Sequence, residues 1–269
     1  MNAVSSVSCH PTAVVASNLP ADTVVGAYAV IEEGVKMGAG CVIASHAILR
    51  KGTILGDGVK VDSFAVIAGL PQDLKFDPAT PSYVKIGSRT VIREGVTIHR
   101  STQKEGSTII GEDCFLMAQS HVGHDCTVGN RVVMANAALL AGHVQVGDCA
   151  FLGGSSGVHQ FVRVGESVML AGMSVATHDI PPYVTAADRN VACGLNLVGI
   201  KRRGFSTEVV AEIKRLYKAI IFKDGDLVAN AQAAQPLAKT PEGRRFVEFF
   251  LAGSRRQFIR SKSKNVVQQ

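Results

Sequence analysis

A six-residue repeat is the feature of this sequence that most restricts how the chain folds. Every sixth residue of the central region is apolar, and the residue four positions after each is small or β-branched. The apolar positions are Ile110, Leu116, Val122, Val128, Met134, Leu140, Val146, Leu152, Val158, Val164, Leu170 and Ala176. One register held this long fits neither the period of an α-helix nor the alternation of a simple strand. A fixed period of six predicts a parallel β-helix.

The same period starts near the N-terminus, at Val7, and runs to Ile67. Three six-residue units make one triangular coil, so residues one coil apart stack in columns about 4.8 Å apart. Each coil satisfies the backbone hydrogen bonds of the next, and the two open ends of the stack need caps. Two segments interrupt the period, near 69–84 and near 103–108. Loops that leave a rigid scaffold often carry function.

A helical pattern replaces the repeat after Ile180–Pro–Pro–Tyr183, because two prolines cannot donate hydrogen bonds to another rung. Ser206 is a suitable N-cap for one helix, and Thr240–Pro–Glu opens another. We therefore predict a mainly β protein with a small C-terminal α-helical domain. The expected parts are a β-helix over 1–182, a linker over 183–195 and a basic helical domain over 196–269 that caps the last coil.

Charge divides unevenly between the expected parts. Residues 1–195 contain 13 Lys and Arg against 16 Asp and Glu, a net charge of −3. Residues 196–269 contain 15 against 6, a net charge of +9. A basic surface attracts phosphates, nucleic acid or an acidic protein, although a solvated helix surface explains the same composition.

Composition and the N-terminus favour a cytoplasmic protein with no stable membrane insertion. No apolar run approaches the roughly 18 residues that span a bilayer, and the first residues lack the basic start and apolar core of a signal peptide. The six cysteines form no Cys-x-x-Cys pair. Cys41, Cys114 and Cys126 occupy inward positions of their repeats, so we expect reduced cysteines that serve as small core residues.

Four histidines converge on successive rungs of the predicted coil. His124, Gly142 and Gln160 are one coil apart and form one column, Asp125 and His143 form the next, and His121 and His159 lie close to the same edge. Histidine accepts a proton near neutral pH, and a carboxylate fixes its tautomer. Adjacent side chains of a strand point to opposite faces, so a turn is needed for Asp125 to reach His124.

A glycine lies one rung from His124 in this column. A backbone N–H at Gly142 is suited to stabilise a developing oxyanion, a contribution of about 3–4 kcal/mol for one donor. A general base contributes about 100- to 10,000-fold. No Ser or Cys stands beside His124 in its column. The pattern therefore favours direct attack by a substrate group over a covalent acyl-enzyme.

Several motifs, in order along nearly the whole chain, resemble the acyl-[acyl carrier protein]–UDP-N-acetylglucosamine O-acyltransferases of lipid A biosynthesis. They are Gln72-Asp-Leu-Lys75, Thr97-Ile-His-Arg100, His121-x-x-His-Asp-Cys-Thr-Val-Gly-Asn-Arg131, Leu140-Ala-Gly-His143, Val158-His-Gln160, Pro181-Pro-Tyr183, Gly194-Leu-Asn196 and Lys201-Arg-Arg-Gly-Phe205. The hexapeptide repeat alone is shared by many transferases, whereas the ordered set is specific.

The resemblance implies a left-handed β-helix, a homotrimer with sites between subunits, and a role for individual residues. It makes His124 the general base, Asp125 its support and Gly142 the oxyanion amide. It assigns the glucosamine and diphosphate to Gln72, Asp73, Lys75, His121, His143, His159 and Gln160, and the nucleotide end and acyl donor to Asn196, Arg202 and Arg203. It places Gly172 in the acyl-chain pocket, where glycine leaves room for a longer chain.

The resemblance also implies the partners: UDP-N-acetylglucosamine, and an acidic acyl carrier protein that suits the +9 module, with no nucleic acid. It implies no cofactor and no metal, since the acyl carrier thioester is itself a substrate. Three residues depart from the family pattern. Ser101 stands where the family commonly has glycine, and Val198 stands where an acidic residue is common. Arg189 lies in a segment that often reads Gly-Asn-His. These changes concern the expected uridine contacts, and a sugar with a 3-amino group stays open as acceptor.

Three other functions fit parts of the pattern. The N-acyltransferase of the same pathway shares the repeat and the histidine, but usually carries an N-terminal uridine-binding domain for which the early repeat leaves no room. A zinc lyase resembling the gamma-class carbonic anhydrases would use His121, His124 and His143 as ligands. A non-enzymatic β-helical scaffold predicts that replacing His124 affects only stability.

Overall fold

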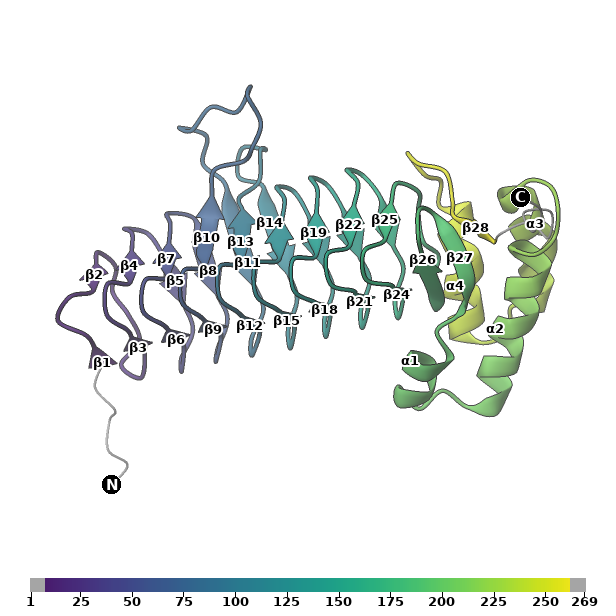
Figure 1. Cartoon of the computed structure of the whole chain (residues 1–269), viewed down its shortest axis with the longest axis horizontal. Helices are drawn as coiled ribbons and strands as arrows, with labels where there is room; N and C mark the ends of the chain where they lie inside the picture. Colours follow the sequence, from purple (N-terminus) through teal and green to yellow (C-terminus); the bar gives the residue numbers. More distant parts are fainter. Residues whose placement is uncertain (1–7, 262–269) are drawn as a thin grey trace.

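Short strands joined by tight turns wind most of the chain into a left-handed parallel β-helix, and four helices follow it (Figure 1). The computed structural model describes residues 8–261. Val7, where we expect the repeat to begin, and the outer ends of the predicted first and last domains lie outside the described residues. The predicted fold class is confirmed. No helix among the described residues is long and apolar enough to cross a membrane.

Three sheets form the sides of the coil, and each strand up to β26 pairs in parallel with the strand one coil away. The first sheet contains β1 (Ser8–Cys9), β3 (Val24–Val25), β6 (Val42–Ile43), β9 (Lys60–Val61), β12 (Val91–Ile92), β15 (Phe115–Leu116), β18 (Val133–Met134), β21 (Phe151–Leu152), β24 (Met169–Leu170), β26 (Val184–Ala187), β27 (Val191–Leu195) and β28 (Arg260–Ser261). The second contains β2 (Val14–Val15), β4 (Val30–Ile31), β7 (Ile48–Leu49), β10 (Val66–Gly69), β13 (Thr97–His99), β16 (His121–Val122), β19 (Leu139–Leu140), β22 (Gly157–Val158) and β25 (Val175–Ala176). The third contains β5 (Lys36–Met37), β8 (Thr53–Leu55), β11 (Tyr83–Ile86), β14 (Ser107–Ile110), β17 (Thr127–Val128), β20 (Gln145–Val146) and β23 (Arg163–Val164).

The core lies along the axis of the coil and consists of the repeat positions. All twelve apolar residues from Ile110 to Ala176 are buried, with at most 3% of each exposed. The residues four positions later are buried too, among them Cys114 and Cys126, as the sequence predicts. Burial of a large aliphatic side chain contributes about 1.5–3 kcal/mol, so the column of repeats stabilises the stack along its whole length.

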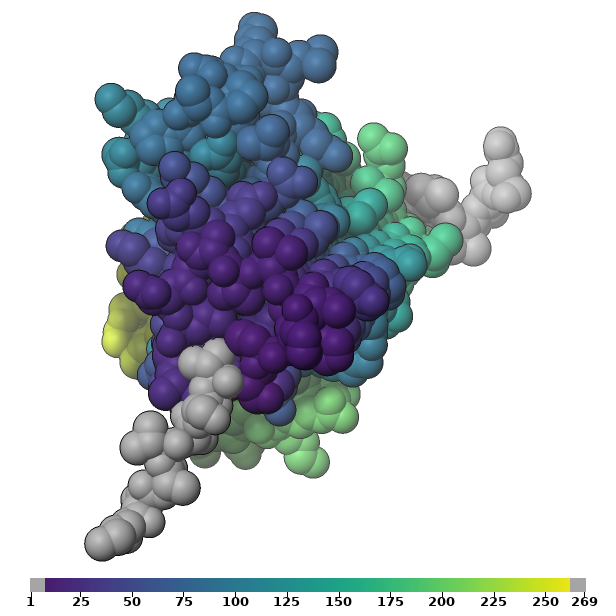
Figure 2. Space-filling view, turned by 90° about the vertical axis from the view of Figure 1, so that its left-hand side faces the viewer, coloured from purple at the N-terminus to yellow at the C-terminus, as the bar shows by residue number. Residues whose placement is uncertain are grey.

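The two predicted interruptions are loops that leave the coil between β10 and β11 (residues 70–82) and between β13 and β14 (residues 100–106). They lie against each other: Arg100 donates to the carbonyl oxygens of Pro78 and Thr80, and Glu105 N–H donates to the carbonyl of Pro81. The end-on view shows the first loop projecting beyond the outline of the coils (Figure 2).

The expected linker at 183–195 is instead part of the first sheet. β26 pairs in parallel with β24 and antiparallel with β27. The two prolines do not end the coil, because the flanking residues make the rung bonds: Ile180 N–H donates to Arg163, and Tyr183 N–H to Glu166. Pro182 lies in the turn before β26, where no ladder donor is needed. The division of the chain into separate domains stays a prediction.

The helices α1 (Leu197–Arg202), α2 (Thr207–Ile220), α3 (Leu227–Ala234) and α4 (Pro241–Leu251), with the 3₁₀ turn η1 (Gln235–Leu237), lie at the C-terminal end of the coil (Figure 1). The predicted caps are confirmed: Ser206 accepts from Val209 N–H, and Thr240 from Gly243 N–H. Phe246 of α4 stacks on Tyr183 beside β26, so the helices bury the last coil.

Candidate functional site

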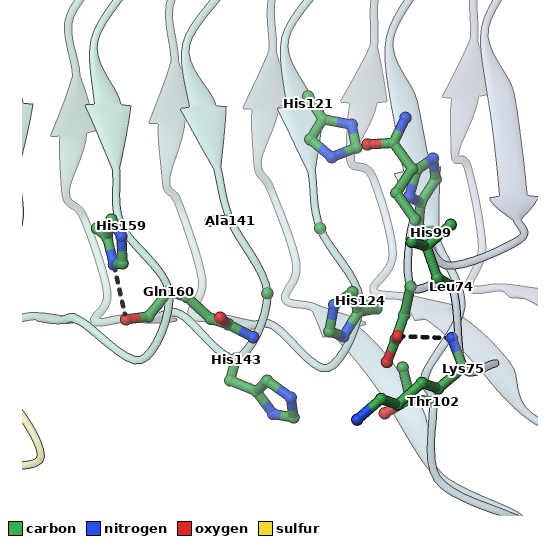
Figure 3. A pocket seen from close by; sticks show the side chains of 14 residues that line it. Leu74, Lys75, His99, Thr102, His121, His124, Ala141, His143, His159 and Gln160 are labelled. Carbon is green, nitrogen blue, oxygen red and sulfur yellow. Dashed lines mark hydrogen bonds between the residues drawn. The ribbon is translucent and has the colours of Figure 1, made fainter.

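A cavity of about 670 Å³ lies along the edge between the second and third sheets (Figure 3). It is lined by Gln72, Asp73, Leu74, Lys75, His99, Thr102, His121, Gly123, His124, Ala141, Gly142, His143, His159 and Gln160. Nine of these are predicted site residues. The two loops and three successive rungs of the coil therefore supply one concave surface with a high density of polar side chains.

The stacking of coils creates this arrangement. His124, Gly142 and Gln160 follow β16, β19 and β22, and His143 N–H donates to the carbonyl of His124 at 2.9 Å. Phe161 N–H donates to the carbonyl of Gly142 at 3.2 Å, so the next rung repeats the same turn. The structure therefore confirms that His124, Gly142 and Gln160 stack on successive rungs of one edge.

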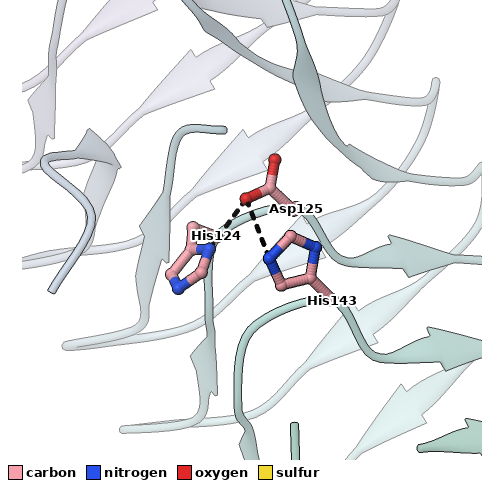
Figure 4. A group of neighbouring side chains, drawn as sticks. All are labelled: His124, Asp125 and His143. Carbon is pink, nitrogen blue, oxygen red and sulfur yellow. Dashed lines mark hydrogen bonds and ion pairs between the residues drawn. The ribbon is translucent and has the colours of Figure 1, made fainter. Parts of the chain in front are cut away.

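Asp125 connects two histidines of adjacent rungs (Figure 4). Its Oδ2 lies 2.8 Å from His124 Nδ1 and 3.6 Å from His143 Nε2. The required turn is present, because Asp125 has a φ of 61° and its side chain folds back beside its neighbour. An ionised carboxylate only accepts hydrogen bonds, so His124 Nδ1 carries the proton and its Nε2 keeps a lone pair. This is the tautomer that a general base needs.

Asp125 is held ionised by its neighbours, although its side chain is only 9% exposed. Burial raises the pKa of this carboxyl, but hydrogen bonds from Ser101, Thr102 and His124 outweigh burial and hold its pKa below the ordinary value. Burial lowers the pKa of His143, while the Asp125 charge opposes that effect. Sequence reasoning missed Ser101 and Thr102 as partners, since the loop that carries them falls outside the column count.

Gly142 lies against the imidazole of His124. A Cβ at this position would be 2.5 Å from Cε1 and 2.6 Å from Nε2 of His124, so any side chain would displace the ring. Its N–H has no acceptor among the described residues. Asn130 holds the same turn position as Gly142, on the edge between the third and first sheets. There the backbone N–H does have a partner, because Asn130 N–H donates to Asp148 at 2.8 Å. Gly142 thus presents an unpaired donor beside a lone-pair nitrogen.

His99 and His121 form the wall of the cavity nearest the loops. Their rings meet edge to face at 4.7 Å, and His121 Nδ1 lies 2.7 Å from Thr97 Oγ1. Burial and the neighbouring His121 lower the pKa of His99 to about 4, and burial also lowers the pKa of His121. Both rings are therefore neutral at pH 7. The sequence analysis did not single out His99, because the inserted loop shifts the column count there.

The other wall includes His159 and Gln160, which are reached by the chain segment after α4. Arg256 donates to His159 Nδ1 at 3.0 Å and to the carbonyl of Gln160 at 3.0 Å. His159 Nδ1 also lies 3.4 Å from the Gln160 carbonyl, where it would have to donate (Figure 3). The contact with Arg256 is shorter and arginine is always a donor, so we assign Nδ1 as the acceptor and Nε2 as the protonated nitrogen. In the first loop, Lys75 N–H donates to Asp73 Oδ1 at 3.0 Å (Figure 3).

Four predicted residues lie elsewhere. Asn196, Arg202 and Arg203 line a separate pocket of about 650 Å³ with Leu197, Val198 and residues of the first sheet. Asn196 also caps α1 by accepting from Gly199 N–H, and Arg203 donates to Glu166 and Ser167. Gly172 follows β24, on the edge between the first and second sheets, and lines neither cavity. A single chain therefore does not bring all predicted residues together.

The zinc ligand set considered from the sequence is not assembled. Among the described residues, the group with ligand atoms within 4.8 Å of one another is His124, Asp125 and His143, without His121. Both histidines of that group direct a nitrogen at the same carboxylate oxygen. His121 instead contacts Thr97.

Comparisons with known proteins agree with this geometry. A family model described as UDP N-acetylglucosamine O-acyltransferase, domain 2, matches residues 179–259, and a bacterial transferase hexapeptide model matches residues 107–142. The acyl-[acyl-carrier-protein]–UDP-N-acetylglucosamine O-acyltransferase of Thiobacillus denitrificans is 46% identical over 257 residues, which cover 93% of this chain and 98% of the relative. The chain belongs to this O-acyltransferase family.

Other relatives support the same membership. The Burkholderia lata enzyme of the same name is 46% identical over 164 residues, and this match spans 60% of the chain and 62% of the relative. The UDP-N-acetylglucosamine acyltransferase structure from Francisella novicida has a TM-score of 0.86 at 31% identity and covers 97% of this chain and 94% of that chain. The Campylobacter jejuni structure has a TM-score of 0.84 at 36% identity and covers 96% and 98%.

Proposed function

We propose that this O-acyltransferase family member moves a 3-hydroxyacyl chain from an acyl carrier protein thioester to the 3-hydroxyl of UDP-N-acetylglucosamine, the first step of lipid A biosynthesis. The observation that carries the proposal is the His124–Asp125 pair beside the unpaired N–H of Gly142 in one cavity. The names of the relatives supply the substrates.

The reaction follows from these groups. His124 Nε2 takes the proton of the sugar 3-hydroxyl as its oxygen attacks the thioester carbonyl carbon. The carbonyl oxygen gains negative charge, which the Gly142 N–H stabilises. The C–S bond then breaks, the ester forms, and the imidazolium returns the proton to the leaving thiolate. Asp125 stays ionised throughout and stabilises the imidazolium, as a carboxylate partner of histidine does.

The remaining predicted residues are proposed to hold the substrates. His159 offers an Nε2 donor, and Lys75 a cation, to the sugar and diphosphate. Arg202 and Arg203, in the +9 module, are proposed to meet the nucleotide end and the acidic carrier. Gly172 stays a predicted acyl-pocket residue. A homotrimer, a cytoplasmic location and a reaction that needs no added cofactor are parts of the same proposal.

The test is acyl transfer by purified protein with UDP-N-acetylglucosamine and a panel of 3-hydroxyacyl carrier proteins. We expect product with the wild type and a loss of at least about 100-fold in kcat for His124→Ala. His10→Ala is a matched control, because His10 is exposed and far along the chain from the cavity. If product forms only with a UDP sugar that carries a 3-amino group, the acceptor is that amine and not the 3-hydroxyl. Equal rates for wild type and His124→Ala would contradict the assigned base.

A further inference from the structure

Ser101 lies behind the cavity and touches the carboxylate that supports the proposed base. It belongs to the 100–106 loop, is 1% exposed, and does not line the cavity. Its hydroxyl donates to Oδ1 of Asp125 and accepts from Gln103 N–H at 3.0 Å. Ser82 donates to the Ser101 carbonyl at 2.6 Å, which fixes the loop from the other side.

The bonds to Asp125 divide between its two oxygens. Oδ1 receives the Ser101 hydroxyl, and Oδ2 receives Thr102 Oγ1 at 2.7 Å and His124 Nδ1 at 2.8 Å. Thr102 N–H lies 3.2–3.3 Å from both oxygens. Without the Ser101 bond, only the longer contact to Thr102 N–H holds Oδ1, so the carboxylate is less constrained against rotation. Rotation would move Oδ2 away from His124.

We propose that Ser101 is a positioning residue for acyl transfer: its hydroxyl fixes the orientation of the Asp125 carboxylate, which in turn fixes the tautomer and position of His124. This inference deepens the proposed function and rests on it. The sequence comparison associated Ser101, in place of the usual glycine, with the uridine contacts. The contact with Asp125 connects this residue of the chain with proton transfer instead.

The same contact has a consequence for pH dependence. The groups that face Asp125 are His124 and His143 from the coil and, across a neighbouring pocket, Arg163 and Arg255. The Cys126 thiol is buried behind it, and its pKa is raised to about 12, so it is uncharged. The Ser101 bond lowers the pKa of Asp125. Its removal is expected to raise that pKa, so the Asp125 carboxylate would take up a proton at a higher pH than in the wild type.

The experiment compares wild type, Ser101→Ala and Ser156→Ala in steady-state acyl transfer at neutral pH. Ser156 is a matched control, because it is 1% exposed and its hydroxyl has no partner among the described residues. For Ser101→Ala we expect kcat about tenfold lower, KM within about twofold, and an Asp125 carboxyl that titrates at a higher pH. Ser156→Ala is expected to follow the wild type.

Three results would overturn the inference: an unchanged kcat in Ser101→Ala, a change in KM alone, or the same change in Ser156→Ala. A direct titration keeps this test separate from the proposed function. Asp125 is followed by ¹³C NMR of labelled aspartate carboxyls, with Asp125→Asn for assignment. If the wild type makes no product, the proposed function fails, yet an Asp125 titration that is the same in Ser101→Ala would still refute the positioning role.

Discussion

At the scale of single residues, left-handed backbone conformations make the site possible. Asp125, His143 and Phe161 occupy equivalent turn positions with φ of 61°, 60° and 68°. Such turns bend the chain from one sheet to the next, so consecutive residues no longer point to opposite faces. His124 and Asp125 can therefore bond side by side, and His143 stacks on Phe161 at 4.7 Å one rung further. A regular strand offers no such pairing.

Gly142→Ala is predicted to disable the site by sterics. The added Cβ would lie 2.5–2.6 Å from His124 ring atoms, so the imidazole must leave the Asp125 carboxylate or the backbone must shift. We expect kcat to fall by at least about 100-fold, the contribution of a positioned general base. Gly157→Ala is the control, because a Cβ there meets nothing within 4 Å. Equal kinetics of the two variants, measured in one assay, would exclude this packing argument.

His99 predicts a dependence of stability on pH. Its pKa is about 4 in the folded state against an ordinary value of 6.5. Between these values the unfolded chain binds the proton and the folded chain does not, so the free energy of unfolding falls as pH falls from 6.5 towards 4. We expect a contribution of about 1–3 kcal/mol, absent in His99→Gln. Urea unfolding at pH 7 and pH 4.5 measures it, with exposed His10→Gln as control; parallel losses in both variants would contradict the assignment.

At the scale of elements, the six-residue repeat makes the coil predictable from the sequence. The two loops that interrupt the repeat carry site residues whose positions the repeat does not predict. Because residues one coil apart stack, the sequence alone placed His124, Gly142 and Gln160 on one edge. Ser101 and Thr102 approach Asp125 from a loop whose path the period does not encode. Likewise, Arg256 reaches His159 from the segment after α4, across almost 100 residues of chain, and only tertiary packing brings them together.

Asp179 is predicted to be a buried polar anchor between the last coil and the segment after α4. It is fully buried and accepts from Arg163 Nε at 2.7 Å and from Ser254 at 2.6 Å. Asp179→Asn leaves the Arg163 cation without its buried charge partner, which costs about 3–5 kcal/mol. Thermal unfolding measures the loss. The exposed pair of Arg89 and Asp113 provides the control: Asp113→Asn is expected to change the midpoint little, and an equal change in both would contradict the anchor.

At the scale of the whole molecule, the predicted substrate residues form two groups that share no cavity. The cavity with His124 and the pocket with Asn196, Arg202 and Arg203 have no lining residue in common. If both groups serve one substrate, as the family resemblance implies, two chains must bring them together. A cyclic oligomer does this, since a head-to-tail interface pairs one surface of each chain with a different surface of the next. This is a physical reason to expect a cyclic oligomer whose sites lie between subunits, and the proposed homotrimer is one such ring.

Mixed oligomers test this arrangement. Arg202→Ala removes an exposed cation of the second pocket, and His124→Ala removes the base, so each variant alone is expected to lose most of its activity. When the two are co-expressed and assemble at random, a site is complete if the chain that supplies His124 lies beside a chain that supplies Arg202. About a quarter of the sites then recover wild-type activity.

The controls for this experiment are two preparations mixed after purification without subunit exchange, which must stay inactive, and co-expression of His124→Ala with Gly142→Ala. The second pair alters the same cavity twice, so no combination of chains restores a complete site. If activity recovers when His124→Ala is co-expressed with Arg202→Ala, and in neither control, neighbouring chains share each site. If the Arg202 pair recovers nothing while oligomers form, both groups act within one chain, and the two pockets belong to different ligands.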